Sequence, residues 1–177
     1  MLIFGYKKIK GQVTFEGEDI SNLSTDKIAK KGIFMSFQSP EEILGISTLN
    51  FLKVAKKSIE DKPVKIFEFK DTVKKYVDEL NMNQKLIDRN LNVGFSGGEK
   101  KKNEVLQIKM LKPKLIILDE IDSGLDVDSL KIVAENINEY KKERQLQTSF
   151  KCLQLPFFIY YMELLFKFSQ IERRTAC

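Results

Sequence analysis

One segment constrains the fold more than any other. Four consecutive aliphatic residues at positions 115–118 are followed directly by two acids, Asp119 and Glu120. Such a run is typical of a strand buried on both faces, as in a parallel sheet covered by helices. Ligands of open α/β sheets bind at the carboxyl ends of the strands, where the two carboxylates could hold Mg²⁺ and orient or deprotonate a water molecule. A strand that simply ends in solvated acids fits the pattern as well.

A second segment predicts a helix whose start is open to an anion. Ser96 and Glu99 have the spacing of a capping box. Gly97 and Gly98 carry no side chain, so the backbone N–H groups there are accessible to a phosphate, which the helix dipole also favours. A cap with a purely structural role is the alternative. The predicted apolar face of this helix consists of Val105, Ile108 and Leu111, flanked by Leu106 and Met110.

The order and spacing of these segments resemble the ATP-binding-cassette (ABC) family. Residues 95–99 (Phe-Ser-Gly-Gly-Glu) are similar to its signature motif, residues 115–120 to its Walker B strand, and residues 123–126 to its D-loop. Upstream, a strand predicted at residues 32–37 ends in Gln38, which matches the glutamine of the family's Q-loop. The resemblance covers roughly residues 11–143 and is highly specific.

Within the family, three stretches are similar to SufC, the ATPase subunit of the SUF iron–sulfur cluster assembly system. They are residues 37–47, 95–107 and 119–126, and Glu99 stands where transporter ATPases usually carry Gln. The resemblance implies the α/β class, with a partial ABC-type P-loop NTPase core, a mostly parallel sheet with flanking helices and a helical subdomain.

The resemblance divides the chain into four regions. Residues 1–46 and 94–143 form the ATPase core, residues 47–93 the helical subdomain, and residues 144–177 an aromatic-rich tail. Apolar spacing predicts helices at 47–59 and 66–82. In the first region the sequence predicts a strand from Gly11, a turn near Gly17 and a short helix capped by Ser24.

Two parts of the family pattern are missing. No Walker A loop, Gly-x-x-x-x-Gly-Lys-Ser/Thr, is present, and from the family order it would fall before Met1. The chain contains no histidine, so the family's switch histidine is absent, and the pattern stops after Glu143. We interpret the tail as a shifted reading frame or mis-joined exon, with a lineage-specific tail that packs on a partner as the alternative. The chain is therefore expected to lack ATPase activity by itself.

The resemblance implies a mechanism with two copies arranged transiently head to tail, and with ATP and Mg²⁺ as cofactors. Asp119 and Gln38 would contact the metal, while Glu120 would be the general base and Gln38 would also contact the attacking water. The signature residues would bind the nucleotide held by the other copy, and the D-loop would link the two sites. These residues are Ser96, Gly97, Gly98 and Glu99 in the signature, and Ser123, Gly124 and Asp126 in the D-loop.

The implied function is ATP binding and hydrolysis that changes the conformation of a SUF scaffold, with SufB/SufD-like proteins as partners. One alternative is the nucleotide-binding subunit of an ABC transporter, and another is a fragment that occupies the scaffold without hydrolysis. A DNA-repair or chromosome-organising ATPase would need long coiled-coil arms, and the sequence has no sustained heptads.

Composition limits the remaining possibilities. With 42% hydrophobic and 31% charged residues, the chain is ordinary for a soluble globular protein. The lack of histidine excludes the usual zinc sites and Ser-His or Cys-His catalysis. The net charge of +5 comes from Lys scattered among acids, which does not favour nucleic acid, and Lys100–Lys102 is predicted to be a solvated helix face. No segment is long enough to insert into a membrane, and a cytoplasmic or organelle-stroma location is expected.

Overall fold

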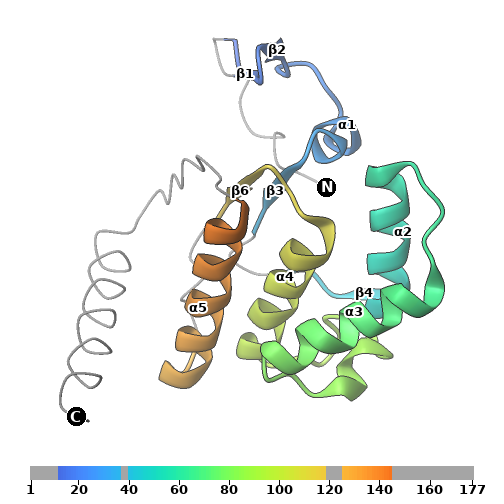
Figure 1. The fold of residues 1–177 in the computed structure, drawn as a ribbon, viewed down its shortest axis with the longest axis vertical. Helices are drawn as coiled ribbons and strands as arrows, with labels where there is room; N and C mark the ends of the chain where they lie inside the picture. Colours follow the sequence, from blue (N-terminus) through green and yellow to red (C-terminus); the bar gives the residue numbers. More distant parts are fainter. Residues whose placement is uncertain (1–11, 37–39, 119–124, 145–177) are drawn as a thin grey trace.

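The computed structural model describes residues 12–36, 40–118 and 125–144 (Figure 1). Its elements are short strands interspersed with helices, as expected for the α/β class. In chain order they are β1 (Thr14–Phe15), β2 (Glu18–Asp19), α1 (Thr25–Lys30), β3 (Ile33–Met35), β4 (Ile43–Ser47), α2 (Thr48–Glu60), α3 (Ile66–Glu79), the 3-10 helix η1 (Gln84–Ile87), β5 (Asn90–Leu91), α4 (Gly97–Leu111), β6 (Leu115–Ile117) and α5 (Val127–Arg144).

The two strands that matter for the site, β3 and β6, pair in parallel. Ile33 lies opposite Leu115 and Met35 opposite Ile117, and the N–H of Ser36 extends the ladder by donating to the carbonyl of Ile117 at 2.8 Å. In the described part of the chain each of these strands has only the other as a neighbour. The flanking residues of β6 are accordingly half-buried, although its central residue is 1% exposed. The expectation of a strand buried throughout was therefore too strong.

Helix α4 lies at the centre of the described structure. It packs against α5 on one side and against α2 and α3 on the other (Figure 1). Because it has neighbours on several sides, its buried residues are not confined to one stripe. The predicted apolar residues are indeed buried, except for the half-buried Leu111, but polar and charged residues are buried with them. These additional residues are Lys101, Asn103, Glu104 and Lys109.

The helices α2 and α3 follow the predicted pattern closely. Ser47 caps α2 by accepting a hydrogen bond from the N–H of Asn50 at 3.3 Å, and Asp61 ends the helix in a left-handed conformation with φ of 49°. Buried side chains of α2 and α3 join those of α4, α5 and β6 in one continuous apolar cluster. The division of the chain at residues 46 and 93 stays a prediction.

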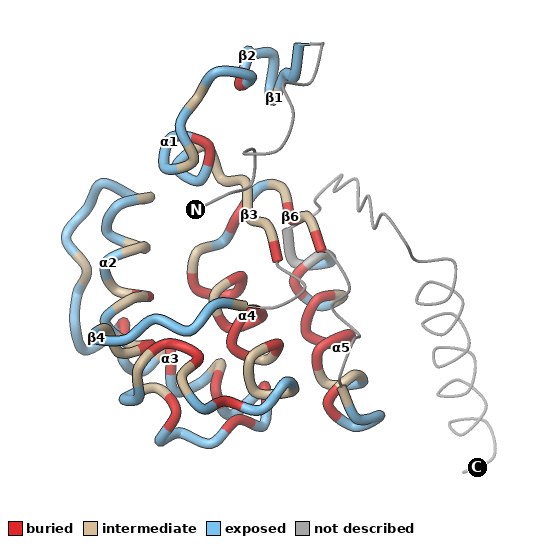
Figure 2. Tube along the Cα trace, turned by 180° about the vertical axis from the view of Figure 1, so that it is seen from behind, coloured by how far each residue is buried: buried red, intermediate tan, exposed pale blue. Residues whose placement is uncertain are grey.

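The N-terminal part of the described chain is a small exposed hairpin followed by a short helix (Figure 2). Strands β1 and β2 are antiparallel, and Glu16 and Gly17 form the predicted turn with φ of 52° and 81°. Ser24 stands at the start of α1, but its side chain makes no capping hydrogen bond. The Ser24 hydroxyl bonds instead to Asp26, whose pKa it lowers. Ser24 therefore occupies the predicted N-cap position of α1, without the side-chain hydrogen bond that such a cap usually makes.

None of the helices within the described ranges has the length and apolar character needed to cross a membrane. Most of the predicted tail, residues 145–177, lies outside the described residues, so its interpretation stays a prediction.

Candidate functional site

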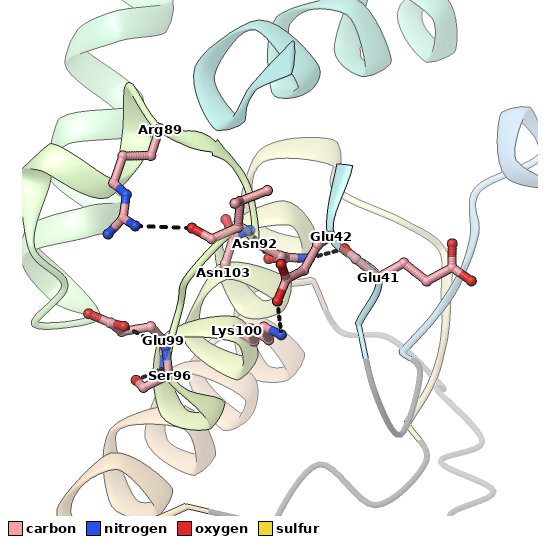
Figure 3. Close-up of polar contacts among 9 residues, drawn as sticks. Glu41, Glu42, Arg89, Asn92, Ser96, Glu99, Lys100 and Asn103 are labelled. Carbon is pink, nitrogen blue, oxygen red and sulfur yellow. Dashed lines mark hydrogen bonds and ion pairs between the residues drawn. The ribbon is translucent and has the colours of Figure 1, made fainter. Parts of the chain in front are cut away.

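The N-terminal end of α4 has the geometry that the sequence predicts. The Ser96 hydroxyl accepts from the N–H of Glu99 at 3.2 Å, and the Glu99 carboxylate accepts from the N–H of Ser96 at 2.7 Å, which completes the capping box (Figure 3). The first N–H groups of a helix have no acceptor within it, and those of Gly97 and Gly98 have none elsewhere in the described residues. Ser96 and Gly97 are exposed. The positive end of this helix therefore carries two unpaired N–H donors, of which Gly97 is exposed and Gly98 is half-buried.

The residues that lead into α4 anchor this end. Phe95 is 6% exposed and belongs to the core. The guanidinium of Arg89 lies 5.7 Å from the centre of its ring and donates from Nη2 to the carbonyl of Val93 at 3.1 Å. Gly94 has φ of 66°, and a Cβ at that position would lie 2.8 Å from Arg89 Nη2. A glycine is thus required both by the backbone conformation and by the guanidinium.

Asp126 lies close to this helix start, at the beginning of α5. Its two carboxylate oxygens accept from the N–H of Ser129 at 2.8 Å and from the Ser129 hydroxyl at 2.9 Å. The hydrogen bond from the Ser129 N–H lowers the pKa of Asp126 most, and the bond from the Ser129 hydroxyl lowers it further. A Cβ on Gly98 would contact Ser129 Oγ at 3.5 Å and Leu125 Cδ2 at 3.6 Å. Asp126 therefore caps α5, a role that its spacing to Ser129 could have indicated, and the start of α5 packs against Gly98.

A buried polar cluster joins α4 to the end of β3. The Ser36 hydroxyl donates to Glu104 Oε2 at 2.9 Å, and Lys101 Nζ lies 3.2 Å from the same oxygen. Ser36, Lys101 and Glu104 are 0%, 2% and 4% exposed. Lys101 is therefore not part of a solvated face, contrary to the prediction for this lysine cluster. The Glu104 carboxylate, one helical turn away, pairs with the Lys101 ammonium group in the interior.

The neighbouring lysines are also held by specific partners. Lys100 Nζ lies 2.8 Å from Glu42 Oε1, and Lys102 Nζ donates to the carbonyl of Asn81 at 3.3 Å. The contact with Glu42 crosses 58 positions of sequence, which is why apolar spacing and local charge patterns gave no sign of it.

The remaining predicted site residues lie outside the described residues. They are Gln38, Asp119, Glu120, Ser123 and Gly124. Their roles stay predictions, as do those of the signature and D-loop residues described above. The described part of the chain contains no group of three or more potential metal ligands. It does show that the chain leaves β3 at Ser36 and β6 at Leu118 at the same edge of the sheet, because the two strands are parallel and in register.

A hollow of about 310 Å³ opens elsewhere, between α2, α3 and the C-terminal end of α4. Met110 and Lys112 line it. It lies about 20 Å from Ser96 along the helix axis, given a rise of about 1.5 Å per residue. This hollow is therefore not part of the candidate anion site.

Comparison with known proteins gives the family of this chain. The sequence matches the ABC transporter family over residues 1–123. It is 45% identical over 140 residues to the "probable ATP-dependent transporter slr0075" of Synechocystis, covering 77% of this chain and 55% of that protein. It is 44% identical over 140 residues to the "probable ATP-dependent transporter SufC" of Escherichia coli, covering 77% of this chain and 56% of that protein. The chain thus spans little more than half the length of these curated relatives.

The fold comparison agrees. The dimeric ABC transporter cassette MJ0796 superposes with a TM-score of 0.66 at 14% identity, covering 78% of this chain and 61% of that one. At this identity the likeness concerns the fold alone, and it confirms the predicted α/β cassette. The family model covers more than half of the sequence, and SufC is among the relatives matched. On this evidence the chain belongs to the ABC transporter family of ATP-binding cassettes and is similar to SufC.

Proposed function

We propose that the N-terminal end of α4 binds the phosphates of a nucleotide held by a second protomer. The observation that carries this proposal is the helix start, where Ser96 and Gly97 are exposed and the capping box leaves the N–H groups of Gly97 and Gly98 without an acceptor in the described residues. An anion there gains hydrogen bonds and a favourable interaction with the helix dipole. The family, whose solved members include a cassette bound to ADP and phosphate, supports a nucleotide as the anion.

In the complete ATP-hydrolysing unit, this chain would contribute residues that act on its own nucleotide and residues that link the two nucleotide sites. Asp119 and Gln38 would hold Mg²⁺, which polarises the phosphates, and Glu120 would accept a proton from the attacking water. Asp126, with Ser123 and Gly124, would link the two nucleotide sites. Hydrolysis by this chain alone is not part of the proposal, since the sequence contains no Walker A loop.

The finer proposal is a role in SUF iron–sulfur cluster assembly, in the cytoplasm or an organelle stroma. The similarity to SufC and the acidic Glu99 in the signature support it. A head-to-tail ATPase dimer would then change the conformation of SufB/SufD-like scaffold proteins. The second candidate is the nucleotide-binding subunit of a transporter, because several relatives carry the words "ATP-dependent transporter" in their names.

The anion site is tested by adding one negative charge to it. Gly97→Asp would place a carboxylate at the exposed helix start, whereas the control Ser58→Asp adds the same charge on the exposed part of α2. The measurement is ATP-dependent association of the chain with E. coli SufC, followed by analytical ultracentrifugation. We expect Gly97→Asp to weaken this association by on the order of tenfold or more, since like charges repel, and Ser58→Asp to leave it unchanged. Equal association of both variants would refute the proposed site.

Two further measurements separate the remaining alternatives. Co-purification with a soluble SufB/SufD-like pair supports the SUF role, whereas co-purification with a membrane permease supports the transporter subunit. ATP turnover is measured for the purified chain with and without Glu120→Gln. Turnover that depends on Glu120 would contradict the expectation that this chain is inactive alone.

A further inference from the structure

Residues 40–43, which follow Gln38 in the sequence, lie against the segment that forms the start of α4. Ile43 in β4 pairs with Leu91 in β5. The Asn92 side chain donates from Nδ2 to the carbonyl of Glu41 at 2.9 Å (Figure 3). The contact between Asn92 and Glu41 joins residues that are 51 positions apart. They hold the backbone of residues 40–43 beside the turn that precedes Phe95.

The contact made by Asn92 continues into α4. Asn92 is 4% exposed and has a left-handed backbone with φ of 61°. Its Oδ1 accepts from Asn103 Nδ2 at 2.8 Å, and Asn103 is fully buried in α4. Within the described part of the chain, the Asn103 Oδ1 atom has no hydrogen-bond partner, which is costly for a buried amide. Two amide side chains thus connect the Glu41 carbonyl to the second turn of α4.

A second, independent contact reaches the first turn of α4. Glu42 Oε1 lies 2.8 Å from Lys100 Nζ, and the two side chains are 48% and 21% exposed. Lys100, and then Gly94 through its backbone N–H, lower the pKa of the Glu42 carboxyl. The partners of Glu42 therefore stand on both sides of Ser96, Gly97 and Gly98 in the sequence. Figure 3 shows Glu42, which directly precedes β4, and Lys100 of α4 facing each other.

We infer that residues 40–43 and the start of α4 move as one unit, in which Glu42, Lys100 and Asn92 are positioning residues for the exposed helix start. The functional part of this inference rests on the proposed function. Gln38 is predicted to serve the nucleotide of its own protomer, whereas Ser96–Gly98 would contact the nucleotide of the other. The unit thus holds the segment that follows Gln38 in the sequence beside the helix start of the same chain.

The test uses hydrogen–deuterium exchange of the full chain, read by mass spectrometry on peptides that span residues 93–99. Glu42→Gln and Lys100→Met each remove the ion pair, and the swapped pair Glu42→Lys with Lys100→Glu restores it with reversed charges. The control Glu68→Gln removes the Lys65–Glu68 pair, an exposed ion pair of similar length at 2.9 Å on α3.

We expect each single substitution to accelerate exchange at residues 93–99 by roughly two- to fivefold, the range that an ion pair of this exposure supports. The swapped pair should return the rate to within about twofold of the original, which a purely structural loss would not do. Glu68→Gln should leave these peptides unchanged. Unchanged exchange in both single variants, or acceleration spread evenly over the whole chain, would overturn the inference.

A further variant tests the amide connection. Asn92→Gly keeps the left-handed backbone available and removes both side-chain hydrogen bonds. Exchange should then rise in residues 40–44 as well as 93–99, and a rise confined to one of the two segments would contradict a single unit. No nucleotide is present in these experiments, so their failure is distinguishable from failure of the proposed anion site. If Asn92→Gly does not fold, the ion-pair variants still decide the question.

Discussion

Gly94 allows a quantitative test of how the start of α4 is built. In Gly94→Ala, the new methyl group imposes the left-handed penalty of an L residue, about 1 to 2 kcal/mol, because φ is 66°. Its Cβ would also lie 2.8 Å from Arg89 Nη2, so the guanidinium must move. That movement loses the hydrogen bond to the Val93 carbonyl and the contact with the Phe95 ring, about 1 kcal/mol in an exposed setting. Gly94→Ala is therefore expected to lower the free energy of unfolding by about 2 to 3 kcal/mol in total.

Gly45→Ala provides the matched control. Gly45 has φ of 85° on β4, and a Cβ there would have nothing within 4 Å. Gly45→Ala should therefore carry only the penalty of an L residue in a left-handed conformation, about 1 to 2 kcal/mol. The difference between the two variants, about 1 kcal/mol, then measures the displacement of Arg89.

The assay is equilibrium unfolding in urea, repeated in the Arg89→Ala background. Without the guanidinium, Gly94→Ala should cost no more than Gly45→Ala, because no group stands where the methyl is added. An excess cost of Gly94→Ala that persists in the Arg89→Ala background would show that the contact with Arg89 does not explain it. Equal costs of both glycine substitutions in the original chain would refute the reasoning as well.

The remaining predictions concern the core and the acid end of the pH range. Leu106→Ala, at a fully buried position of α4, should destabilise the chain by about 2 to 5 kcal/mol in urea unfolding, whereas Leu44→Ala, at a 76% exposed position, should stay within about 0.5 kcal/mol. Ser129 lowers the pKa of Asp126 in the folded state below its ordinary value of 3.8. The ionised Asp126 carboxylate therefore stabilises the fold fully above pH 3.8, and this stabilisation is lost as the pH falls through the pKa of the folded state. Urea midpoints measured on acidification should therefore fall less steeply for Asp126→Asn, and an unchanged slope would contradict the assigned cap.

Local signals predicted the helices well. The capping box at Ser96 depends on residues three positions apart, and the apolar spacing that predicted α2 is equally local. The strands β3 and β6 were likewise predicted, each from a short apolar run. These features could be predicted because the atoms that determine them lie close together in the sequence or repeat with a regular period.

Long-range polar contacts could not be predicted in this way. Lys101 belongs to a run of three lysines, which usually indicates a solvated face. Its burial depends on Glu104 and on Ser36, a residue 68 positions away from Glu104. The pairing of Glu42 with Lys100 is equally non-local. Only the folded arrangement of β3, β4 and α4 brings these groups together.

The burial of α4 on several sides has a consequence for how sequences of this kind can vary. An amphipathic surface helix tolerates replacement along its outer face, whereas a helix enclosed by neighbours leaves few positions that accept a new side chain without strain or a void. Library selection over residues 100–111 should consequently recover a narrow set of amino acids, polar as well as apolar. Substitutions at these positions should also affect the exposed turn that begins the helix.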